Sequence, residues 1–503
     1  MPTKKPVRSS KNSPKKASAT RKKAREVRIR MYKQGLGDCF LLTFPGKSKP
    51  FHMLIDCGAL KSKHYGEKEM QDVVAAIQLA TGGGKGKAKG RLDIVAATHE
   101  HWDHISGFLQ AKKLFDDIKV NNVWVAWTEE PENAAAQRLK KEFKKKKKAV
   151  QKALALLPSG QQSDARMGLY RHAISELSGF FGMGAPKGMT TDAAWKYILS
   201  LGRNVYCDPK KRPLELSGVE GVRVYVLGPP EDPDFVRKTL SKKETYDEAT
   251  RGLTLADSFL AAVSDPNDPD NELPDAKERS FPFDGRYRIP EADARRSQFF
   301  LDHYGFDEID NKAGKWRRIN HEWLTVAGEL ALHLDSYTNN TCLAIAIELV
   351  ESGQVLLFPG DAQVGNWLSW GELSWEVTGI DGKMQTVKIE DLLKRTVFYK
   401  VGHHGSHNAT LREKGLERMI DPNLVAMIPV HRPTADDQEW KFPYPPLWKA
   451  LKEKARGRVL LADAPDVTEI EDEAKKMLTD HEWSKFSKAT EFKDLYVEYR
   501  IPY

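Results

Sequence analysis

Apolar and polar residues follow one another along the chain in blocks that predict short strands and a smaller number of helices. Apolar runs of strand length occupy residues 39–44, 53–55, 92–97, 222–227, 342–349, 355–358 and 396–401. Residues 105–115 (ISGFLQAKKLF) instead have the apolar spacing of a helix. A second helix is expected in TTDAAWKYILSLG, with Thr191 or Asp192 as its N-cap and Gly202 as its stop.

Four potential metal ligands lie within six consecutive positions after the apolar run 92–97. In the stretch ATHEHWDHISGF they are His99, His101, Asp103 and His104. A helix would spread them around its circumference, and a strand would place His104 on the face opposite the other three. At a strand-to-helix junction, however, successive side chains can converge on one point, and borderline divalent metals such as zinc accept histidine and aspartate. The stretch therefore predicts a metal site, and the alternative is a polar loop that happens to be rich in histidine.

The order His99-x-His101-x-Asp103-His104 after a hydrophobic strand closely resembles the signature of the metallo-β-lactamase-fold hydrolases. MLIDCGA with Asp56, LLFPGDA with Asp361 and KVGHHGS with the two adjacent histidines repeat the order of strand and then ligand. Together with QGLGDCFLL, VRVYVLGPP, NNTCLAIAIEL and PPLWKALKEKARGRVLLAD, these segments are similar to the hydrolase domain of ComEC-type competence proteins, which handle DNA during uptake. The resemblance implies an α/β fold, the αββα sandwich of the metallo-β-lactamase type, with long insertions that are mainly helical or irregular.

The resemblance also implies a role for each residue of these motifs, in a site with two divalent ions, zinc or manganese. The first ion would be bound by His99 and His101, the second by Asp103, His104 and His403, and both by Asp361. Asp38 and Asp56 would lie behind these ligands, Asp56 orienting a metal-binding histidine. Asp103 would also be catalytic, and His404 or His407 would be the proton donor near the leaving group.

One motif departs from the family pattern. Many of these enzymes have a further metal-binding histidine before the strand that here reads CLAIAIEL, whereas this chain has SYTNNT. Asn339 or Asn340 would replace that histidine, or His333 would reach back from upstream. Because an amide oxygen is a weaker and harder ligand than imidazole, this position favours manganese over zinc.

The basic charge of the chain is concentrated at its N-terminus. The first 25 residues contain ten basic side chains and no acid, whereas the whole chain has a net charge of +9, so the remainder carries −1. We expect residues 1–26 to be a disordered arm that holds phosphate backbones or merely aids solubility. The candidate phosphate contacts are Lys4, Lys5, Lys15, Lys16, Lys22 and Lys23.

The spacing of the motifs predicts one catalytic domain over residues 27–464, with inserts at about 130–205 and 231–329. Residues 465–503 would form a C-terminal extension packed on it. The lysine run 144–148 in the first insert covers all sides of a helix and reads as a solvated helix or hairpin, or else as a nucleic-acid contact.

A cytoplasmic location is expected because no apolar segment follows the basic residues and no run of about 20 apolar residues occurs, so no membrane contact is implied. The four cysteines, Cys39, Cys57, Cys207 and Cys342, lack CxxC spacing and read as reduced, buried thiols. Nothing in the sequence indicates a protein partner.

The expected activity is that of a metal-dependent hydrolase, in which two ions hold a hydroxide between them. The resemblance and the basic arm favour a phosphodiesterase or nuclease acting on DNA or RNA. Other candidates are a small-molecule hydrolase, such as a cyclic-nucleotide phosphodiesterase, a lactonase or another ester hydrolase, and, in a different class, a catalytically silent binding module.

Overall fold

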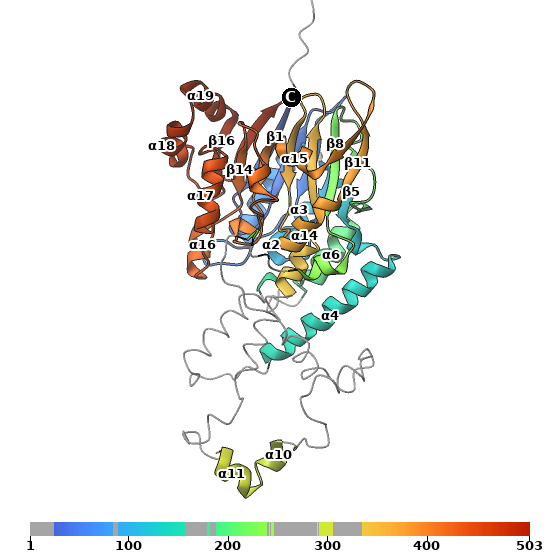
Figure 1. The fold of residues 1–503 in the computed structure, drawn as a ribbon, viewed down its shortest axis with the longest axis vertical. Coiled ribbons are helices and arrows are strands. Elements are labelled where there is room, and N and C mark those ends of the chain that lie inside the picture. The colour runs from blue at the N-terminus through green and yellow to red at the C-terminus, as the bar shows by residue number, and fades with distance from the viewer. Residues whose placement is uncertain are drawn as a thin grey trace, which may run out of the picture.

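The computed structural model describes residues 25–83, 89–155, 179–181, 188–238, 241, 243–245, 289, 291–304 and 334–503. Within these ranges the chain is a mixed α/β protein with two large sheets, a separate two-stranded hairpin and helices around them (Figure 1). The α/β class expected from the sequence is therefore confirmed.

The first sheet contains eight strands in the order β16-β17-β1-β2-β3-β4-β5-β6. Its strands are β1 (Glu26–Tyr32), β2 (Phe40–Phe44), β3 (Phe51–Ile55), β4 (Gly90–Ala96), β5 (Ile118–Ala126), β6 (Arg203–Cys207), β16 (Thr490–Phe492) and β17 (Tyr496–Pro502). Strands β3 to β6 run parallel, and the pair Ile55 and Ala96 brings the ends of β3 and β4 together. The residues that follow these two strands therefore meet at one edge of the sheet.

The second sheet contains seven strands in the order β15-β14-β13-β10-β9-β8-β7. Its strands are β7 (Leu214–Glu215), β8 (Val222–Gly228), β9 (Ala344–Leu349), β10 (Gln354–Phe358), β13 (Thr396–Lys400), β14 (Val425–Ile428) and β15 (Val459–Leu461). Strands β10 and β13 are parallel, with Leu357 paired to Tyr399, so their carboxyl ends are also adjacent. The hairpin of β11 (Ser374–Thr378) and β12 (Met384–Lys388) lies outside both sheets.

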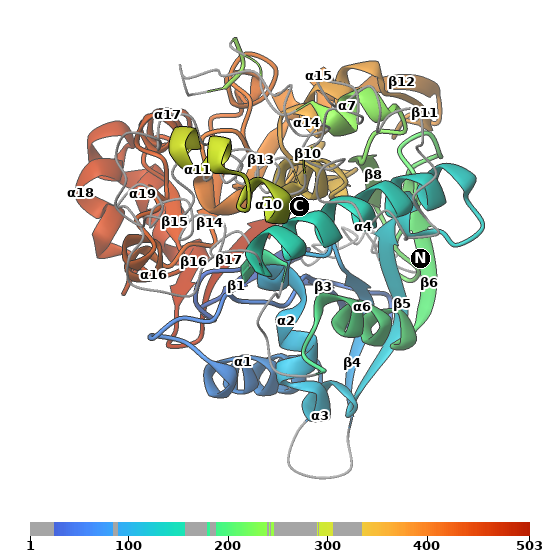
Figure 2. The same ribbon diagram turned by 90° about the horizontal axis from the view of Figure 1, so that it is seen from below.

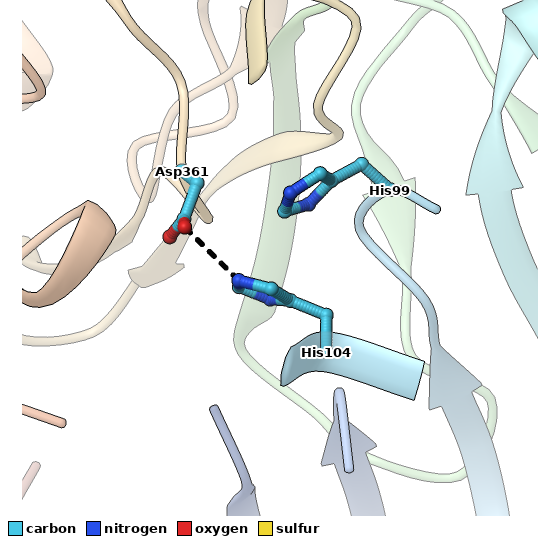
Figure 3. A group of neighbouring side chains, drawn as sticks. All are labelled: His99, His104 and Asp361. Carbon is cyan, nitrogen blue, oxygen red and sulfur yellow. Dashed lines mark hydrogen bonds and ion pairs between the residues drawn. The ribbon is translucent and has the colours of Figure 1, made fainter. Parts of the chain in front are cut away.

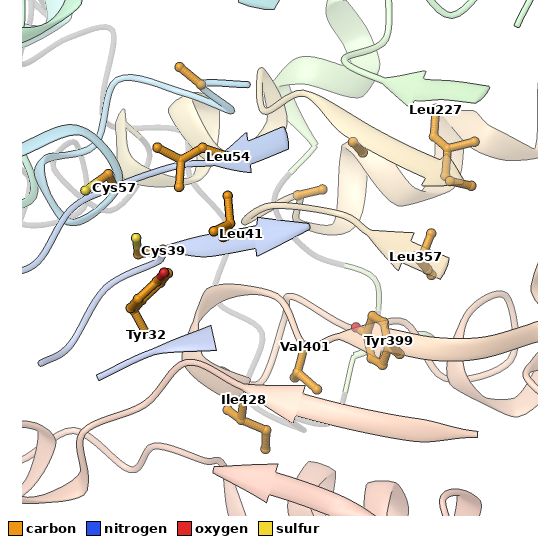
Figure 4. Packing of buried hydrophobic residues seen from close by; sticks show 14 of the residues in the cluster. Tyr32, Cys39, Leu41, Leu54, Cys57, Leu227, Leu357, Tyr399, Val401 and Ile428 are labelled. Atoms are coloured by element: carbon orange, nitrogen blue, oxygen red, sulfur yellow. The ribbon is translucent and has the colours of Figure 1, made fainter. Parts of the chain in front are cut away.

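The two sheets pack against each other through side chains that alternate along each strand. Phe40 of β2 and Phe358 of β10 belong to the same buried cluster, and their rings meet edge to face at 5.9 Å. The neighbouring residues Leu41 and Leu357 belong to the other large cluster, which also contains helical side chains such as Phe108 (Figure 4). This alternation follows from the two-residue period of a strand. Each sheet therefore has one face toward the other sheet and one toward helices.

Helices occupy the outer surfaces and the lower end of the molecule (Figures 1 and 2). They are α1 (Glu67–Ala80), α2 (Trp102–Gln110), α3 (Lys112–Phe115), α4 (Ala134–Ala155), α6 (Thr191–Ser200), α7 (Pro233–Arg237), α10 (Glu291–Ala294), α11 (Gln298–Tyr304), α14 (Val364–Ser369), α15 (Ile389–Lys394), α16 (Arg432–Asp437), α17 (Pro445–Lys454), α18 (Thr468–Met477) and α19 (Asp480–Ala489). Residues 334–340 are also helical. Short 3-10 turns are η1 (Trp127–Glu129), η3 (Trp370–Glu372), η4 (His403–Gly405) and η5 (Leu416–Arg418). Within the described ranges, no helix has both the length and the apolar character needed to cross a membrane.

The first insert was expected at about residues 130–205, and strand β6 of the first sheet begins at Arg203. Its lysine-rich part is the long helix α4, and most of the second insert, like residues 1–24 of the arm, lies outside the described residues. All four cysteines are free and buried, which confirms the expectation of buried thiols.

Candidate metal centre

The histidine-rich stretch is placed where β4 ends and α2 begins. His101 is the N-cap residue of α2, and Asp103 and His104 lie in the first turn of that helix. The segment after β3 lies directly against this turn, because the backbone of Cys57 donates to the carbonyl of His104 at 2.8 Å. A Cβ at Gly58 would lie only 2.5 Å from the backbone of the same turn, so this close approach requires glycine. The strand-to-helix junction predicted from the sequence is therefore formed.

His104 is held between two buried carboxylates, as Figure 3 shows for one of them. Its Nδ1 donates to Asp56 at 2.8 Å, and its Nε2 lies 3.0 Å from Oδ2 of Asp361. Asp56 also accepts hydrogen bonds from the backbone and hydroxyl groups of Thr98, at 2.8 and 2.7 Å. Asp56 therefore fixes the ring orientation of His104 and directs Nε2 toward the cluster, as carboxylates behind metal-binding histidines do.

Three overlapping groups of buried histidine and aspartate side chains bring their ligand atoms within 4.8 Å of one another. They are His99 with His104 and Asp361, Asp103 with Asp361 and His404, and Asp38 with Asp56 and His104. Asp361, which follows β10, belongs to the first two groups. These buried clusters could hold metal ions at the end of the sheets where β4, β10 and β13 stop.

The spacing of the donor atoms suits metal coordination. His404 Nε2 lies 3.0 Å from Asp103 Oδ2, and His104 Nε2 lies 3.5 Å from the same oxygen. Two ligand atoms bonded to one zinc-sized ion at about 2.1 Å are about 3.0–3.4 Å apart in octahedral or tetrahedral geometry. Residues from α2, the β10 end and the β13 end are therefore already at coordination spacing.

Several buried polar atoms in this cluster find no hydrogen-bond partner among the described residues. They are Nε2 of His99, both ring nitrogens of His101, Oδ1 of Asp103, Oδ1 of Asp335 and Oδ1 of Asn339. Each buried polar atom left without a partner costs about 1–3 kcal/mol. A concentration of such atoms in and beside the buried histidine and aspartate groups fits a site that binds a cation.

Burial and mutual charge give the histidines different protonation states. Burial lowers the pKa of His101 to about 3 and that of His403 to about 4, and it takes the pKa of His99 well below its usual value. Burial opposes the charged form of His104 as well, but the surrounding carboxylates, led by Asp361, raise its pKa well above the usual value. His101, His403 and His99 are therefore neutral near pH 7, whereas the carboxylates around His104 and His404 favour the charged form of those two rings.

Lys400, the last residue of β13, is a buried cation that sequence analysis missed. Its ammonium group donates to Oδ1 of Asp361 at 3.0 Å and to the carbonyl of Gly360 at 2.8 Å, and it forms a close ion pair with Asp38. The backbone N–H of His403 donates to the same Asp361 oxygen at 2.9 Å. The signal was a lysine within the apolar strand TVFYKV. This cation holds Asp361 in place and neutralises part of the acidic cluster.

The two adjacent histidines after β13 have different surroundings. His404 is fully buried, donates through Nδ1 to the carbonyl of Pro429 at 2.7 Å, and presents Nε2 to Asp103. His403 has its Nδ1 3.1 Å from the hydroxyl of Ser406 instead. The sequence-based preference was His403 as ligand and His404 or His407 as proton donor, and the structure instead brings His404 into a buried group with Asp103 and Asp361. The reason is that both residues have positive φ, 42° and 53°, so the turn does not follow strand alternation.

The remaining predicted residues are distributed around the cluster. His407 has its ring against Tyr444, 5.9 Å between centroids. Asn340 donates to the carbonyls of residues 236 and 238 and accepts from the backbone of Asn366, so its amide is used in the backbone framework. Asn339 keeps a buried oxygen without a partner in the described structure. His333 and the six arm lysines lie outside the described residues.

Asp335 is the second residue that sequence analysis missed. It lies in the helical segment before β9, and burial, followed by the charges of Asp103 and Asp361, raises its pKa to about 8.

Neither the family models nor the curated proteins compared with the chain give a match. The residues of the buried groups and their geometry are therefore the basis for the proposed function.

Proposed function

We propose that the protein is a metal-dependent hydrolase with the αββα sandwich of the metallo-β-lactamase type. The observation that carries the proposal is the convergence of buried histidine and aspartate atoms, several without hydrogen-bond partners in the described structure, where α2 meets the ends of β10 and β13. The two facing sheets with helices outside them, and the motif order given by the sequence, support the same proposal. The ComEC-type hydrolase domains remain the family that the motifs resemble.

The proposed cofactors are two divalent ions, zinc or manganese. We assign His99 and His101 to one ion, Asp103, His104 and His404 to the other, and Asp361 to both. When bound, such ions supply Lewis acidity, which makes water nucleophilic near neutral pH and stabilises negative charge on the scissile group. The protein's own contribution is orientation: Asp56 fixes the ring of His104, while Lys400 and the backbone of His403 fix Asp361.

The proposed substrate is a phosphodiester in DNA or RNA. Helix α4 crosses the lower end of the molecule, where α2 and α6 also lie, and carries the lysine-rich sequence KKEFKKKKK (Figures 1 and 2). Exposed lysines there, together with the basic arm, would contact phosphates without reading bases. The activity is therefore expected to show little sequence preference.

A substrate panel tests this proposal. Labelled single-stranded DNA, duplex DNA, RNA, cyclic mononucleotides and a chromogenic lactam are each incubated with zinc, manganese or magnesium. We expect cleavage of the polynucleotides, and its loss in Asp103→Asn. Asp93→Asn is the matched control, because Asp93 is a buried carboxylate in β4 that pairs with Arg91 and Asn121 away from the cluster.

The other outcomes separate the remaining candidates. Turnover of cyclic nucleotides alone would replace the nuclease by a small-molecule phosphodiesterase, and turnover of the lactam alone would replace the phosphodiester class. A purified protein that binds no transition metal and turns over nothing would be a silent binding module.

A further inference from the structure

A buried carboxylate lies beside His101 in the helical segment 334–340. Asp335 is 6% exposed, and its Oδ1 lies 3.8 Å from Nε2 of His101. Its other oxygen accepts a hydrogen bond from the side-chain amide of Asn339, one helical turn later, at 3.2 Å. The segment ends just before β9, where the sequence lacks the expected histidine. Asp335 therefore occupies the neighbourhood of the missing ligand.

The facing atoms of His101 and Asp335 are too far apart for a hydrogen bond with each other. At 3.8 Å the two atoms exceed hydrogen-bond distance. Neither ring nitrogen of His101 nor Oδ1 of Asp335 has a hydrogen-bond partner in the described part of the chain. The same part places no lysine or arginine within ion-pair distance of Asp335. Burial of a carboxylate without a neighbouring cation costs free energy, and a cation bound beside Asp335 would offset this cost.

The aromatic side chains packed against His101 do not supply that charge. The ring packs against Phe180 and Phe181, with centroids 5.7 and 5.1 Å away, and against His99 at 4.6 Å. The aromatic rings offer neither a hydrogen bond nor a charge to this imidazole. The unpaired atoms of His99, His101 and Asp335 are three imidazole nitrogens and one carboxylate oxygen, the kinds of donor that zinc and manganese accept.

We propose that Asp335 is a metal ligand and completes, with His99 and His101, the donor set of the first ion. This inference rests on the proposed metal-dependent hydrolase and names the ligand that replaces the missing histidine. Asn339 donates a hydrogen bond from its side-chain amide to the Asp335 carboxylate. The side-chain amide of Asn340 instead donates to a backbone carbonyl. A carboxylate in this position makes the first site harder than a site with three histidines, which favours manganese.

Metal content and affinity, rather than activity, test the ligand role. Wild type, Asp335→Asn and Asp335→His are freed of metal, reloaded with manganese or zinc, and measured by elemental analysis and chelator competition. We expect two ions in wild type, and in Asp335→Asn a loss of affinity of about 100-fold for one of them. Asp335→His restores an imidazole donor and should recover two ions with a shift toward zinc. Asp93→Asn, the matched buried carboxylate, should keep both ions.

Thermal melting of the same variants separates a ligand from a structural residue. Without metal, Asp335→Asn replaces a carboxyl group that is costly to bury by a neutral amide of similar shape, so its Tm should not fall below that of wild type. With metal, the Tm of Asp335→Asn should be lower than that of metal-loaded wild type, because the bound ion stabilises wild type more strongly than the variant. Asp93→Asn breaks an ion pair with Arg91 and should melt lower in both states.

The outcomes distinguish the inference from the function on which it rests. Unchanged affinity for both ions in Asp335→Asn would overturn the ligand role, whatever the hydrolase assays give. Weakened binding in that variant, combined with a wild type that hydrolyses none of the panel, supports the ligand role and overturns the hydrolase. A wild type that binds no manganese or zinc overturns both.

Discussion

The two carboxylate oxygens of Asp361 have different partners. Oδ1 receives the ammonium group of Lys400 and the backbone N–H of His403, and Oδ2 faces His104. One oxygen is therefore anchored by the protein while the other faces the cluster of ligand atoms. Lys400 also neutralises Asp38, so one cation compensates two buried acids.

Replacement of Lys400 by methionine should be strongly destabilising. The substitution leaves Asp38 and Asp361 buried beside an apolar side chain, and breaking a buried ion pair on one side costs about 3–5 kcal/mol. Urea denaturation of the metal-free protein measures this loss, with Lys394→Met as the control at an exposed position of α15. A loss below about 1 kcal/mol would show that Lys400 is not needed to compensate the two acids.

Individual site residues were predictable where they directly follow a strand. Asp56 after β3, His99 after β4 and Asp361 after β10 all lie in the cluster, because a strand end determines where the next side chain goes. His404 was not separable from His403, since the positive φ of both residues breaks strand alternation. Asp335 was missed because it reaches His101 from a helix more than 200 positions later, a proximity that no local pattern contains.

At the level of elements, the apolar runs located the strands that they predicted to within one or two residues, whereas β1, β5, β6, β14 and β17 were not predicted. The run 92–97 became β4 at Gly90–Ala96, and 355–358 became β10 at Gln354–Phe358. The N-cap of α6 is Thr190, one residue before Thr191, because the Thr190 side chain accepts from the backbone of Ala193. Neighbouring threonine and aspartate residues are all acceptable caps by type, so only the backbone conformation decides among them.

Helix α19 gives an element-scale prediction for stability against pH. Glu482 accepts hydrogen bonds from Arg456 at 2.6 Å and from the backbone of Thr479 at 2.8 Å, and these partners, Arg456 first, lower its pKa to about 2. Because the pKa of Glu482 in the folded protein lies below the ordinary glutamate value of 4.5, the interaction stabilises the fold above about pH 4.5 and is lost as the pH falls toward 2.

Comparison of wild type with Glu482→Gln measures this contribution. The difference in unfolding free energy should be largest near neutral pH and shrink toward zero as the pH falls through about 4 to about 2. Asp472→Asn, at an exposed position of α18, serves as the control for removal of one negative charge. A difference that stays constant across this range would contradict the assignment to the Arg456 and Thr479 contacts.

On the scale of the whole molecule, the end of the chain helps to build the first sheet. Residues 465–503 were expected to pack on the domain, but β17 pairs with β1 along seven positions, from Glu26 with Pro502 to Tyr32 with Tyr496. Val497 and Ile501 are buried in the core between the sheets. Neither EVRIRMY nor YVEYRIP was predicted as a strand, and the pairing of segments this far apart in the chain is not specified by a local pattern.

The uneven distribution of charge along the chain gives a whole-molecule prediction for nucleic-acid binding. The basic arm has ten positive charges, whereas the remainder of the chain is nearly neutral, so the arm should dominate the salt dependence of binding. The variant replaces the six candidate lysines, Lys4, Lys5, Lys15, Lys16, Lys22 and Lys23, by glutamine and keeps the length of the chain. If each lysine neutralises one phosphate, the slope of log K against log salt for duplex DNA should become shallower by up to about 5.

Fluorescence anisotropy over a range of salt concentrations measures the slope, with the variant Lys144→Gln and Lys145→Gln on α4 as the comparison. Hydrolysis of a small chromogenic phosphodiester should be unchanged in the arm variant, because that substrate has no second phosphate for the arm lysines to contact. An unchanged slope in the arm variant and a shallower one in the α4 variant would move the phosphate contacts to the helix. If neither variant alters the slope, both basic segments are solvated surfaces and the substrate is not held through its phosphates there.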